Sequence, residues 1–419
     1  MREMKDSGLI WLGKVPINWK VERLQWHLYE INDKNNPIRT TNILSLTNKR
    51  GVIPYEEKGA QGNISKENYN EYHIAYKDTI VANSMNILIG SVGYSNYYGC
   101  VSPVYYVFRE KSNNDLHFLN YLFQTTQFQK ELRKYANGIL EIRLRVSSND
   151  ILKRKVAIPE YNEQIKIVAY LDEQCKKIDD VMSDIQNQIT ALDEYKKSVI
   201  SKAVTKGLNP NAEMNDSGIK WIGFVPSHWK IDKIKFHLKR LEYRNPGDMQ
   251  ILSVYREYGV IPKDSRDDNH NVTSEDTSKY KYVKPGYLVI NKMKAWQGSM
   301  GVSNYEGVES PAYFIYVFID NIFSKKYVHY LLRSTYKNEF RRLSGGIREG
   351  QWDLGPEGFE NTLILIPPID EQEEIVKYID DKCSKIDSII EDKKKQLDML
   401  EEYKKSLIYE YVTGKKKVK

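Results

Sequence analysis

Side chains that build disulfide frameworks and metal centres are scarce in this sequence of 419 residues. It contains three cysteines, and its seven histidines are scattered without the spacing of metal ligands. Two of the cysteines, Cys175 and Cys383, lie at equivalent positions of predicted helices, and the third is Cys100. We therefore expect small buried apolar side chains at these positions, and neither a disulfide nor a zinc site.

Long apolar runs are also missing. No stretch is long and apolar enough to cross a membrane, and the N-terminus lacks the pattern of a signal peptide. These absences predict a cytoplasmic protein that has no membrane partner.

The sequence also lacks the local motifs of common catalytic sites. There is no Gly-x-x-x-x-Gly-Lys-Ser/Thr loop for phosphates, no Gly-x-Gly-x-x-Gly after a predicted strand, and no Asn-Pro-Pro-aromatic run. Carboxylates are plentiful, but none forms a convincing catalytic pair. Catalysis is not excluded by these absences. They favour a binding protein that has no catalytic residues, no metal and no cofactor of its own.

What the chain does contain is an internal repeat. The stretch Glu163–Thr205 recurs without a gap, 208 positions later, as Glu371–Thr413, and 21 of the 43 paired residues are identical. Matching segments continue upstream and include Asp6–Gly13 with Asp216–Gly223, Gly51–Pro54 with Gly259–Pro262, and Ser102-Pro103 with Ser310-Pro311. The chain is therefore two tandem copies of a globular region followed by a rod. The expected ranges are 1–160 and 208–368 for the globular regions, 161–207 and 369–414 for the rods, and 415–419 for a basic tail.

Each rod is predicted to be one long helix. Neither copy of the repeated stretch contains glycine or proline, and its apolar residues recur at steps of four and three, as the seam of a coiled coil requires. The seam residues are Leu171, Cys175, Ile178, Met182, Ile185, Ile189 and Leu192 in the first copy, and Ile379, Cys383, Ile386, Ile390, Leu397 and Leu400 in the second. We expect the two rods to pair with each other. The alternative is two separate helices, each packed on its own globular neighbour.

Polar residues and glycines mark the ends of these helices. The expected N-caps are Asn162 and Asp370, and the expected left-handed C-caps are Gly207 and Gly414. Lys196 and Lys404 interrupt the seam in both copies, and we expect their ammonium groups to reach water.

The globular regions are predicted to have a mixed α/β fold. Short apolar or β-branched runs predict strands at 79–82, 104–108 and 156–159 in the first copy, and at 287–290, 312–318 and 363–368 in the second. Helical spacing predicts one helix over Phe118–Tyr135 and another over Tyr327–Leu343.

The two globular copies share their framework and differ between the shared points. Ser84, Asn86 and Ile87 correspond to Lys292, Lys294 and Ala295, and residues 140–145 share almost nothing with 348–353. A common scaffold with different loops is typical of two recognition modules with two targets, although loops also drift after duplication.

The net charge of +7 is unevenly placed. The rods are slightly acidic, whereas the globular regions and the tail are basic. A basic excess of this size suits a polyanionic partner, but many ordinary surfaces carry as much.

The order of globular region, rod, globular region and rod resembles the specificity subunit of Type I DNA restriction–modification systems. The similarity also includes the Trp-x-Gly…Val-Pro…Trp openings, the prolines before Glu163-Gln164 and Glu371-Gln372, and the rod ends Val204-Thr205 and Val412-Thr413. It covers nearly the whole chain. Each motif is short, but their ordered double occurrence is specific.

The resemblance implies two target recognition domains, each reading one half of a split, asymmetric site in double-stranded DNA. It also implies that the rods bind two modification subunits, which carry the S-adenosylmethionine and adenine-methylation chemistry. Restriction subunits would complete a nuclease that depends on ATP and Mg. The chain itself would then be non-catalytic and would bind none of these cofactors.

Chain order predicts that the rods are antiparallel. A compact domain usually has its ends close together, and the second globular region connects the end of the first rod to the start of the second. An antiparallel coiled coil with pseudo-twofold symmetry would place the two domains at opposite ends of a spacer. The half-sites would lie on the order of one helical turn (~34 Å) apart. The rod length would then fix the unread spacer.

Phosphate contacts are expected from lysine and arginine, and base readout from the loops that differ. The candidates are Lys49, Arg50, Asn86, Arg143 and Arg145 in the first copy, and Arg256, Lys292, Lys294, Arg348 and Gln351 in the second. For each one, a solvated surface role is the alternative. Two other classes of protein stay open: a coiled-coil scaffold whose globular ends bind proteins, and an enzyme that acts on DNA by itself.

Overall fold

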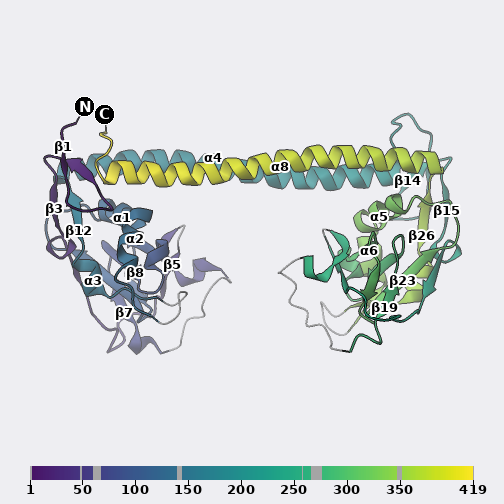
Figure 1. Cartoon of the computed structure of the whole chain (residues 1–419), viewed down its shortest axis with the longest axis horizontal. Helices are drawn as coiled ribbons and strands as arrows, with labels where there is room; N and C mark the ends of the chain where they lie inside the picture. Colours follow the sequence, from purple (N-terminus) through teal and green to yellow (C-terminus); the bar gives the residue numbers. More distant parts are fainter. Residues whose placement is uncertain are drawn as a thin grey trace. The chain divides into compact units, whose positions relative to one another are not determined.

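The computed structural model describes residues 2–47, 50–59, 68–138, 144–256, 258–265, 276–346 and 352–418 (Figure 1). The chain divides into two compact units, one formed by Met1–Ile185 together with Lys394–Lys419, and the other by Gln186–Lys393. Each unit therefore combines one globular region with a segment of both long helices.

The first unit is built on a four-stranded antiparallel sheet with the order β4-β11-β8-β9. Its strands are β1 (Met4–Asp6), β2 (Lys14–Pro16), β3 (Lys20–Arg23), β4 (Leu28–Glu30), β5 (Leu44–Thr47), β6 (Gly51–Pro54), β7 (His73–Ala75), β8 (Thr79–Asn83), β9 (Val92–Ser95), β10 (Gly99–Val101), β11 (Tyr105–Glu110) and β12 (Lys155–Ile158). Its short helices are α1 (Leu116–Gln124), α2 (Thr126–Arg133) and α3 (Ser148–Leu152). Every residue of β8 is buried, which explains its continuous apolar run.

The second unit repeats this sheet with the order β16-β23-β20-β21. Its strands are β13 (Met214–Asp216), β14 (Phe224–Pro226), β15 (Lys230–Lys233), β16 (Leu238–Leu241), β17 (Leu252–Tyr255), β18 (Gly259–Pro262), β19 (Lys281–Val283), β20 (Leu288–Asn291), β21 (Met300–Val302), β22 (Gly307–Glu309), β23 (Tyr313–Phe318), β24 (Ser344–Gly345), β25 (Asp353–Leu354) and β26 (Leu363–Ile366). Its short helices are α5 (Lys325–Ser334), α6 (Lys337–Leu343) and α7 (Pro356–Glu360). The register is also repeated, since Tyr105 pairs with Asn83 and Tyr313 pairs with Asn291.

The two long helices are α4 (Tyr161–Lys206) and α8 (Ile369–Val412). Within the first unit, Tyr170 contacts Tyr411 and Asp179 contacts Lys404, so the residue numbers rise along α4 as they fall along α8. The contacts of the second unit follow the same rule. The helix segments of each unit are therefore antiparallel. The predicted mixed α/β fold, with two globular regions each followed by a long paired helix, is confirmed.

The predicted seam lies on the inner face of these helices. The buried seam residues are Leu171, Cys175, Ile178, Ile185, Ile189, Ile379, Cys383, Ile386 and Ile390. The partly buried ones are Met182, Leu192, Leu397 and Leu400. Cys100, Cys175 and Cys383 are free and buried, as predicted.

We expected the ammonium groups of the seam lysines to reach water, but each one instead forms an ion pair with the facing helix. The Lys404 ammonium group donates to Asp179 at 2.6 Å, and the Lys196 ammonium group donates to Asp387 at 2.6 Å. The two contacts occupy equivalent positions of the repeat. Each lysine therefore pairs with an aspartate of the facing helix. Because the two side chains meet only when the helices are aligned in this way, the ion pair favours one register of the helix pair.

Repeated tryptophans tie both helices to each globular region. Trp19 donates its indole N–H to Glu163 at 3.1 Å, and Trp229 donates to Glu371 at 3.0 Å. Gly414, at the end of α8, packs against Trp19 with a φ of 71°, so a left-handed glycine closes this helix as predicted. Gly207 closes α4 against Trp229 in the same way, with a φ of 70°.

The glutamine that follows each repeated glutamate is buried and hydrogen-bonded to the backbone of the preceding globular region. The Oε1 atom of Gln164 accepts the backbone N–H of Asp115 at 2.8 Å, and its amide donates to the carbonyl of Pro159 at 2.9 Å. Gln372 makes the equivalent contacts in the second unit. The Glu-Gln pair found twice in the sequence thus has a structural role, because it holds the start of each long helix on the preceding globular region.

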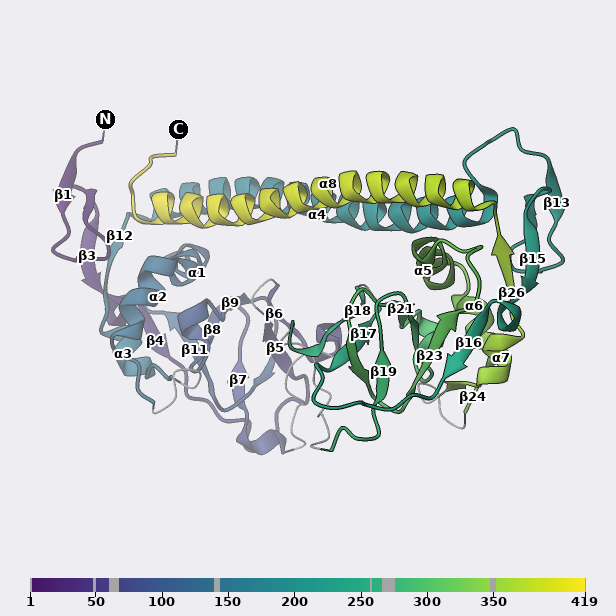
Figure 2. The ribbon, with the colours of Figure 1, turned by 45° about the vertical axis from the view of Figure 1, so that its right-hand side comes forward.

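Two sequence predictions about helix ends are wrong. Residues 118–135 and 327–343 were each expected to form one helix, but the chain turns at Thr125, between α1 and α2, and again between α5 and α6. Asn162 and Asp370 are not N-caps. They lie inside the first turn of α4 and α8, because these helices already begin at Tyr161 and Ile369. The first helix of each pair lies beside a long helix (Figure 2), where Tyr121 of α1 donates to Asp172 at 2.6 Å.

Among the described residues, we find no helix that is both long enough and apolar enough to span a membrane.

Candidate functional site

A tight turn follows the buried central strand of each sheet. We call Ser84–Asn86, after β8, the first tip turn, and Lys292–Lys294, after β20, the second tip turn. The Asn83 side chain accepts the backbone N–H of Met85 at 3.0 Å, and the Asn291 side chain accepts that of Met293 at 3.1 Å. The asparagines are shared by both repeats. They fix the same backbone path while the side chains on it differ.

The described end of the other differing segment, residues 144–145 or 352–353, lies beside the tip turn of its repeat. The backbone N–H of Val146 donates to the carbonyl of Ser84 at 3.3 Å, and that of Leu354 donates to the carbonyl of Lys292 at 3.0 Å. These two differing segments are about 60 positions apart in sequence. The fold brings the tip turn together with residues 144–145 in the first unit and with residues 352–353 in the second, as a recognition surface built from variable loops requires.

Two of the predicted DNA-contacting residues are found at the first tip turn, one on the turn itself and one beside it. Asn86 is exposed on the turn, and the Arg145 guanidinium lies 3.6 Å from the sulfur of Met85. Arg50 is elsewhere, between β5 and β6, where Glu57 binds its guanidinium at 2.6 Å. Two further candidates, Lys49 and Arg143, lie outside the described residues.

The second tip turn carries Lys292 and Lys294. Lys294 is exposed, whereas the Lys292 ammonium group forms an ion pair with Asp353 at 2.8 Å. Arg256 follows β17, and its carbonyl accepts a hydrogen bond from the Arg333 guanidinium. Arg348 and Gln351 are outside the described residues.

Aromatic residues beside the second tip turn escaped the sequence analysis. Trp296 and Trp352 lie with their ring centroids 5.6 Å apart, and the Arg341 guanidinium lies 5.5 Å from the Trp352 ring centroid. The first copy has Leu88 and Leu144 at the two tryptophan positions. The paired difference in the aligned repeats was a usable signal, since a tryptophan can stack on a base or an arginine in a way that leucine cannot.

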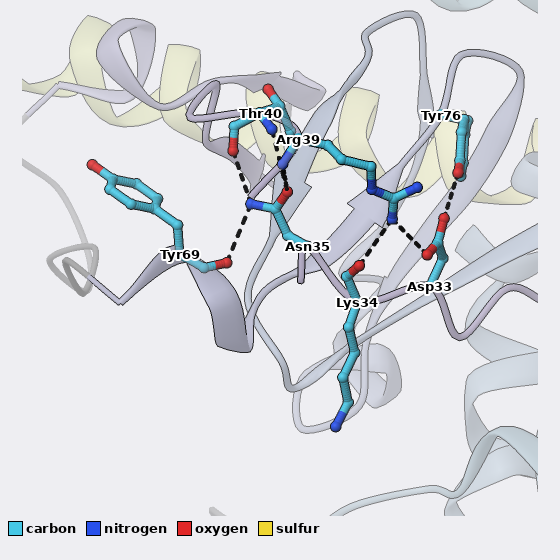
Figure 3. Close-up of polar contacts among 7 residues, drawn as sticks. All are labelled: Asp33, Lys34, Asn35, Arg39, Thr40, Tyr69 and Tyr76. Carbon is cyan, nitrogen blue, oxygen red and sulfur yellow. Dashed lines mark hydrogen bonds and ion pairs between the residues drawn. The ribbon is translucent and has the colours of Figure 1, made fainter. Parts of the chain in front are cut away.

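A second group of polar and aromatic residues surrounds residues 33–40 of the first unit (Figure 3). The buried Asn35 side chain donates to the carbonyl of Thr40 at 2.8 Å and accepts the backbone N–H of Arg39 at 2.8 Å. Asp33 accepts from the Arg39 guanidinium and from the Tyr76 hydroxyl, each at 2.5 Å. These hydrogen bonds, with that from Arg39 first, lower the pKa of Asp33. The loop is therefore fixed by its own side chains.

Further tyrosines lie beside this group in the first unit, and the second unit also contains a tyrosine pair. Tyr76 lies 5.7 Å from the partly exposed Tyr98, and the Arg109 guanidinium lies 5.0 Å from the Tyr76 ring. In the second unit, the ring centroids of Tyr243 and Tyr282 lie 5.6 Å apart. Both tyrosine pairs meet edge to face. Aromatic rings beside cations suit the bases and the backbone of a nucleic acid. We missed these clusters in the sequence because their members come from separate segments that do not match between the repeats.

Comparison with known protein families gives a direct match. The family model for the Type I restriction modification DNA specificity domain matches residues 16–191 and 231–399. The specificity subunit of the Type I restriction enzyme MjaVIII from Methanocaldococcus jannaschii is 23% identical over 430 residues, which cover 97% of this chain and 95% of that relative.

Solved structures show the same fold. A chain from a structure on complex assembly and conformational transition of the type I R-M system superposes with a TM-score of 0.67 at 12% identity, covering 95% of this chain and 98% of that one. The HsdS subunit from Thermoanaerobacter tengcongensis superposes with a TM-score of 0.52 at 14% identity, covering 96% of this chain and 98% of that one.

Proposed function

The chain belongs to the Type I restriction modification DNA specificity domain family, and from this premise we propose that it gives a Type I restriction–modification complex its sequence specificity. Each globular region reads one half of a bipartite, asymmetric site in double-stranded DNA. The chain has no catalytic role of its own.

The two tip turns support this proposal most directly. Both have the same asparagine-fixed backbone, and both lie beside the described end of the second differing segment of their repeat. The exposed side chains of the turns differ in donor and acceptor character: Asn86 in the first repeat and Lys294 in the second. Ser84 is buried, and Lys292 pairs with Asp353. Asparagine pairs well with adenine and lysine with guanine in the major groove. Two copies of one scaffold that present different donors suit a site with two different halves.

Cationic residues outside the turns would contact phosphates. Arg50, Arg145 and Arg256 belong to this group in our proposal, together with the undescribed candidates Lys49, Arg143 and Arg348. Gln351 is proposed as a base reader. Phosphate contacts position the protein without adding sequence information.

The long helices are the proposed docking site for two modification subunits, and restriction subunits would join that assembly. S-adenosylmethionine, ATP and Mg are assigned to those partners, so the transfer and cleavage chemistry takes place outside this chain. Since its substrate is cellular DNA, we place the complex in the cytoplasm. We also propose that the paired helices set the length of the unread spacer.

The test is a methylation map. The chain is expressed with its modification subunit in a host free of DNA methylation, and methyladenine is mapped across the genome. We expect a bipartite motif that disappears when the chain is omitted. A soluble complex that leaves no motif would instead favour a protein-binding scaffold, and methylation or cleavage by the pure chain would show an enzyme.

Tip-turn exchange makes the test residue-specific. The variant Lys294→Asn gives the second turn the exposed polar residue of the first, and we expect a change in one half of the motif. The matched variant Asn86→Lys should change the other half, and Ser84 is kept because its side chain is buried. If either variant altered both halves, or neither, the assignment of one half to each turn would be wrong.

A further inference from the structure

Each tip turn presents a methionine at its centre. Met85 and Met293 occupy equivalent positions, and each has its backbone N–H bound by the preceding asparagine side chain. The strand ladder continues to the base of the turn, since Asn83 donates its N–H to the carbonyl of Ser91 at 3.0 Å, and the equivalent bond in the second unit is also 3.0 Å. The turns are thus firmly anchored on buried strands.

Core packing does not account for these methionines. Met293 is 41% exposed, and Met85 is partly exposed. Neither belongs to the main hydrophobic cores that the described residues form. The Met85 side chain also meets a polar group, since the Arg145 guanidinium lies 3.6 Å from its sulfur.

The neighbours of these methionines make their identity informative. On both sides of the methionine, the two repeats carry different residues: serine and asparagine in one, and two lysines in the other. The methionine itself is the same. A side chain that reads a base would be expected to change with the half-site, whereas a contact common to both half-sites would not.

We infer that Met85 and Met293 act as apolar wedges, each pressing against a base step of the DNA half-site bound by its own globular region, whatever the sequence of that step. The inference rests on the proposed function, because it requires the tip turns to face DNA. Methionine suits this role because it is unbranched, polarisable and able to adapt to different surfaces. Apolar side chains of this kind partly unstack base steps in other DNA-binding proteins.

The wedge and the flanking side chains then have separate tasks. The methionine carries no strong hydrogen-bond donor, so it contributes affinity without reading the sequence. Beside it, the exposed side chains of Asn86 and Lys294 face the base edges next to the opened step. Ser84 is buried and Lys292 pairs with Asp353, so neither is given this task. Loss of the wedge should therefore weaken all binding equally and leave the sequence preference intact.

The experiment measures binding of the full chain, together with its modification subunit, to a duplex that carries the mapped motif and to a scrambled duplex. Met85→Ala and Met293→Ala are each expected to bind both duplexes roughly 10- to 100-fold more weakly, the equivalent of burying one methionine side chain. The ratio between the two duplexes should stay constant. Met85→Leu and Met293→Leu should retain most of the affinity, because leucine can also act as a wedge.

Base unstacking gives a second readout. With 2-aminopurine in place of single adenines of the motif, the wild-type complex should raise the fluorescence at one step in each half. Met85→Ala should remove the signal in one half, and Met293→Ala the signal in the other. Met4→Ala and Met214→Ala are the controls, since these equivalent methionines lie in β1 and β13, outside both turns and outside the long helices.

The outcomes separate this inference from the proposed function. If the wild-type chain binds no duplex selectively, both fail. If it binds selectively and the alanine variants keep their affinity, or lose affinity for the motif alone, the wedges are rejected while the proposed function stands. Thermal unfolding of each variant checks the fold, and we expect unchanged midpoints because neither side chain belongs to a main core.

Discussion

Glu309 is a carboxyl group placed where the fold favours an apolar residue. It lies in β22 and is 1% exposed, and its Oε1 atom has no hydrogen-bond partner among the described residues. Burial raises the pKa of Glu309 well above the ordinary range of a glutamate. The equivalent residue of the first repeat is Val101, which is fully buried in β10. The second unit therefore tolerates this side chain mainly in its neutral form.

Replacing Glu309 with valine should stabilise the second unit. We expect Glu309→Val to increase the free energy of unfolding by roughly 1–3 kcal/mol near neutral pH, since it removes a buried polar group that lacks a full set of partners. The pH dependence has a defined sign. Because the folded pKa is raised, the wild type has its full stability below the unfolded pKa of about 4.3 and loses stability as the pH rises towards the folded value. The variant should lack this decline. Thermal unfolding over a pH series measures both effects.

The reciprocal substitution is the control. Val101→Glu places the same carboxyl group in the first unit, and it should destabilise that unit increasingly as the pH rises. A Glu309→Val variant that keeps the pH dependence of the wild type would contradict the assignment to Glu309.

Elements defined by long-range periodicity could be predicted from the sequence, whereas breaks inside periodic segments could not. The seam and the glycine C-caps of α4 and α8 follow from spacing and from backbone freedom at Gly207 and Gly414. The separation of α1 from α2 does not, because the helical apolar spacing continues through Thr125, which adopts an extended conformation. Thr125 is the N-cap residue of α2, and its hydroxyl donates to the carbonyl of Leu122. A single threonine does not distinguish a cap from a helix interior, so the break could not be predicted from it.

The candidate site shows the same division. Comparison of the two repeats located the tip turns, since both are fixed by the shared asparagines and differ in side chains. The clusters around Tyr76 and Tyr282 depend on contacts between segments that are distant in sequence and different in each repeat. A single sequence does not indicate which of its 31 tyrosines meet.

At the helix seam, apolar burial should outweigh the ion pairs. Leu171 is fully buried, so Leu171→Ala should cost about 2–5 kcal/mol through lost burial and a residual cavity. Lys404→Ala removes the contact with Asp179, whose carboxylate is largely exposed, and should cost less than about 1 kcal/mol because solvent screens the pair. Chemical denaturation measures the free energy of unfolding of both variants and so ranks the two contributions. Ile379→Ala is the equivalent apolar change in the second unit. A larger effect for Lys404→Ala would mean that the ion pairs, rather than the seam, hold the helices together.

On the scale of the whole molecule, both units are built from both repeats. The first unit needs the end of α8, and the second needs the end of α4, because Trp19 and Trp229 each contact the end of one long helix and the start of the other. Neither globular region with its own helix reproduces a whole unit. The two globular regions, which read the DNA in our proposal, are thus joined by two continuous helices rather than by flexible linkers.

Helix length should therefore determine the spacing between the two halves of the recognised motif. Inserting one seam heptad into α4 after Ile185 and one into α8 after Lys393, where the chain passes between units, preserves the seam and lengthens each helix by about 10.5 Å. That length corresponds to roughly three base pairs of B-DNA, since one helical turn of about 34 Å holds 10–10.5 base pairs. We expect the methylation map of this variant to show the same two half-sites with a spacer longer by up to about three base pairs. Inserting the heptad into α4 alone shifts one helix against the other and should weaken the complex instead. An unchanged spacer in an active double-insertion variant would show that the helices do not measure the DNA.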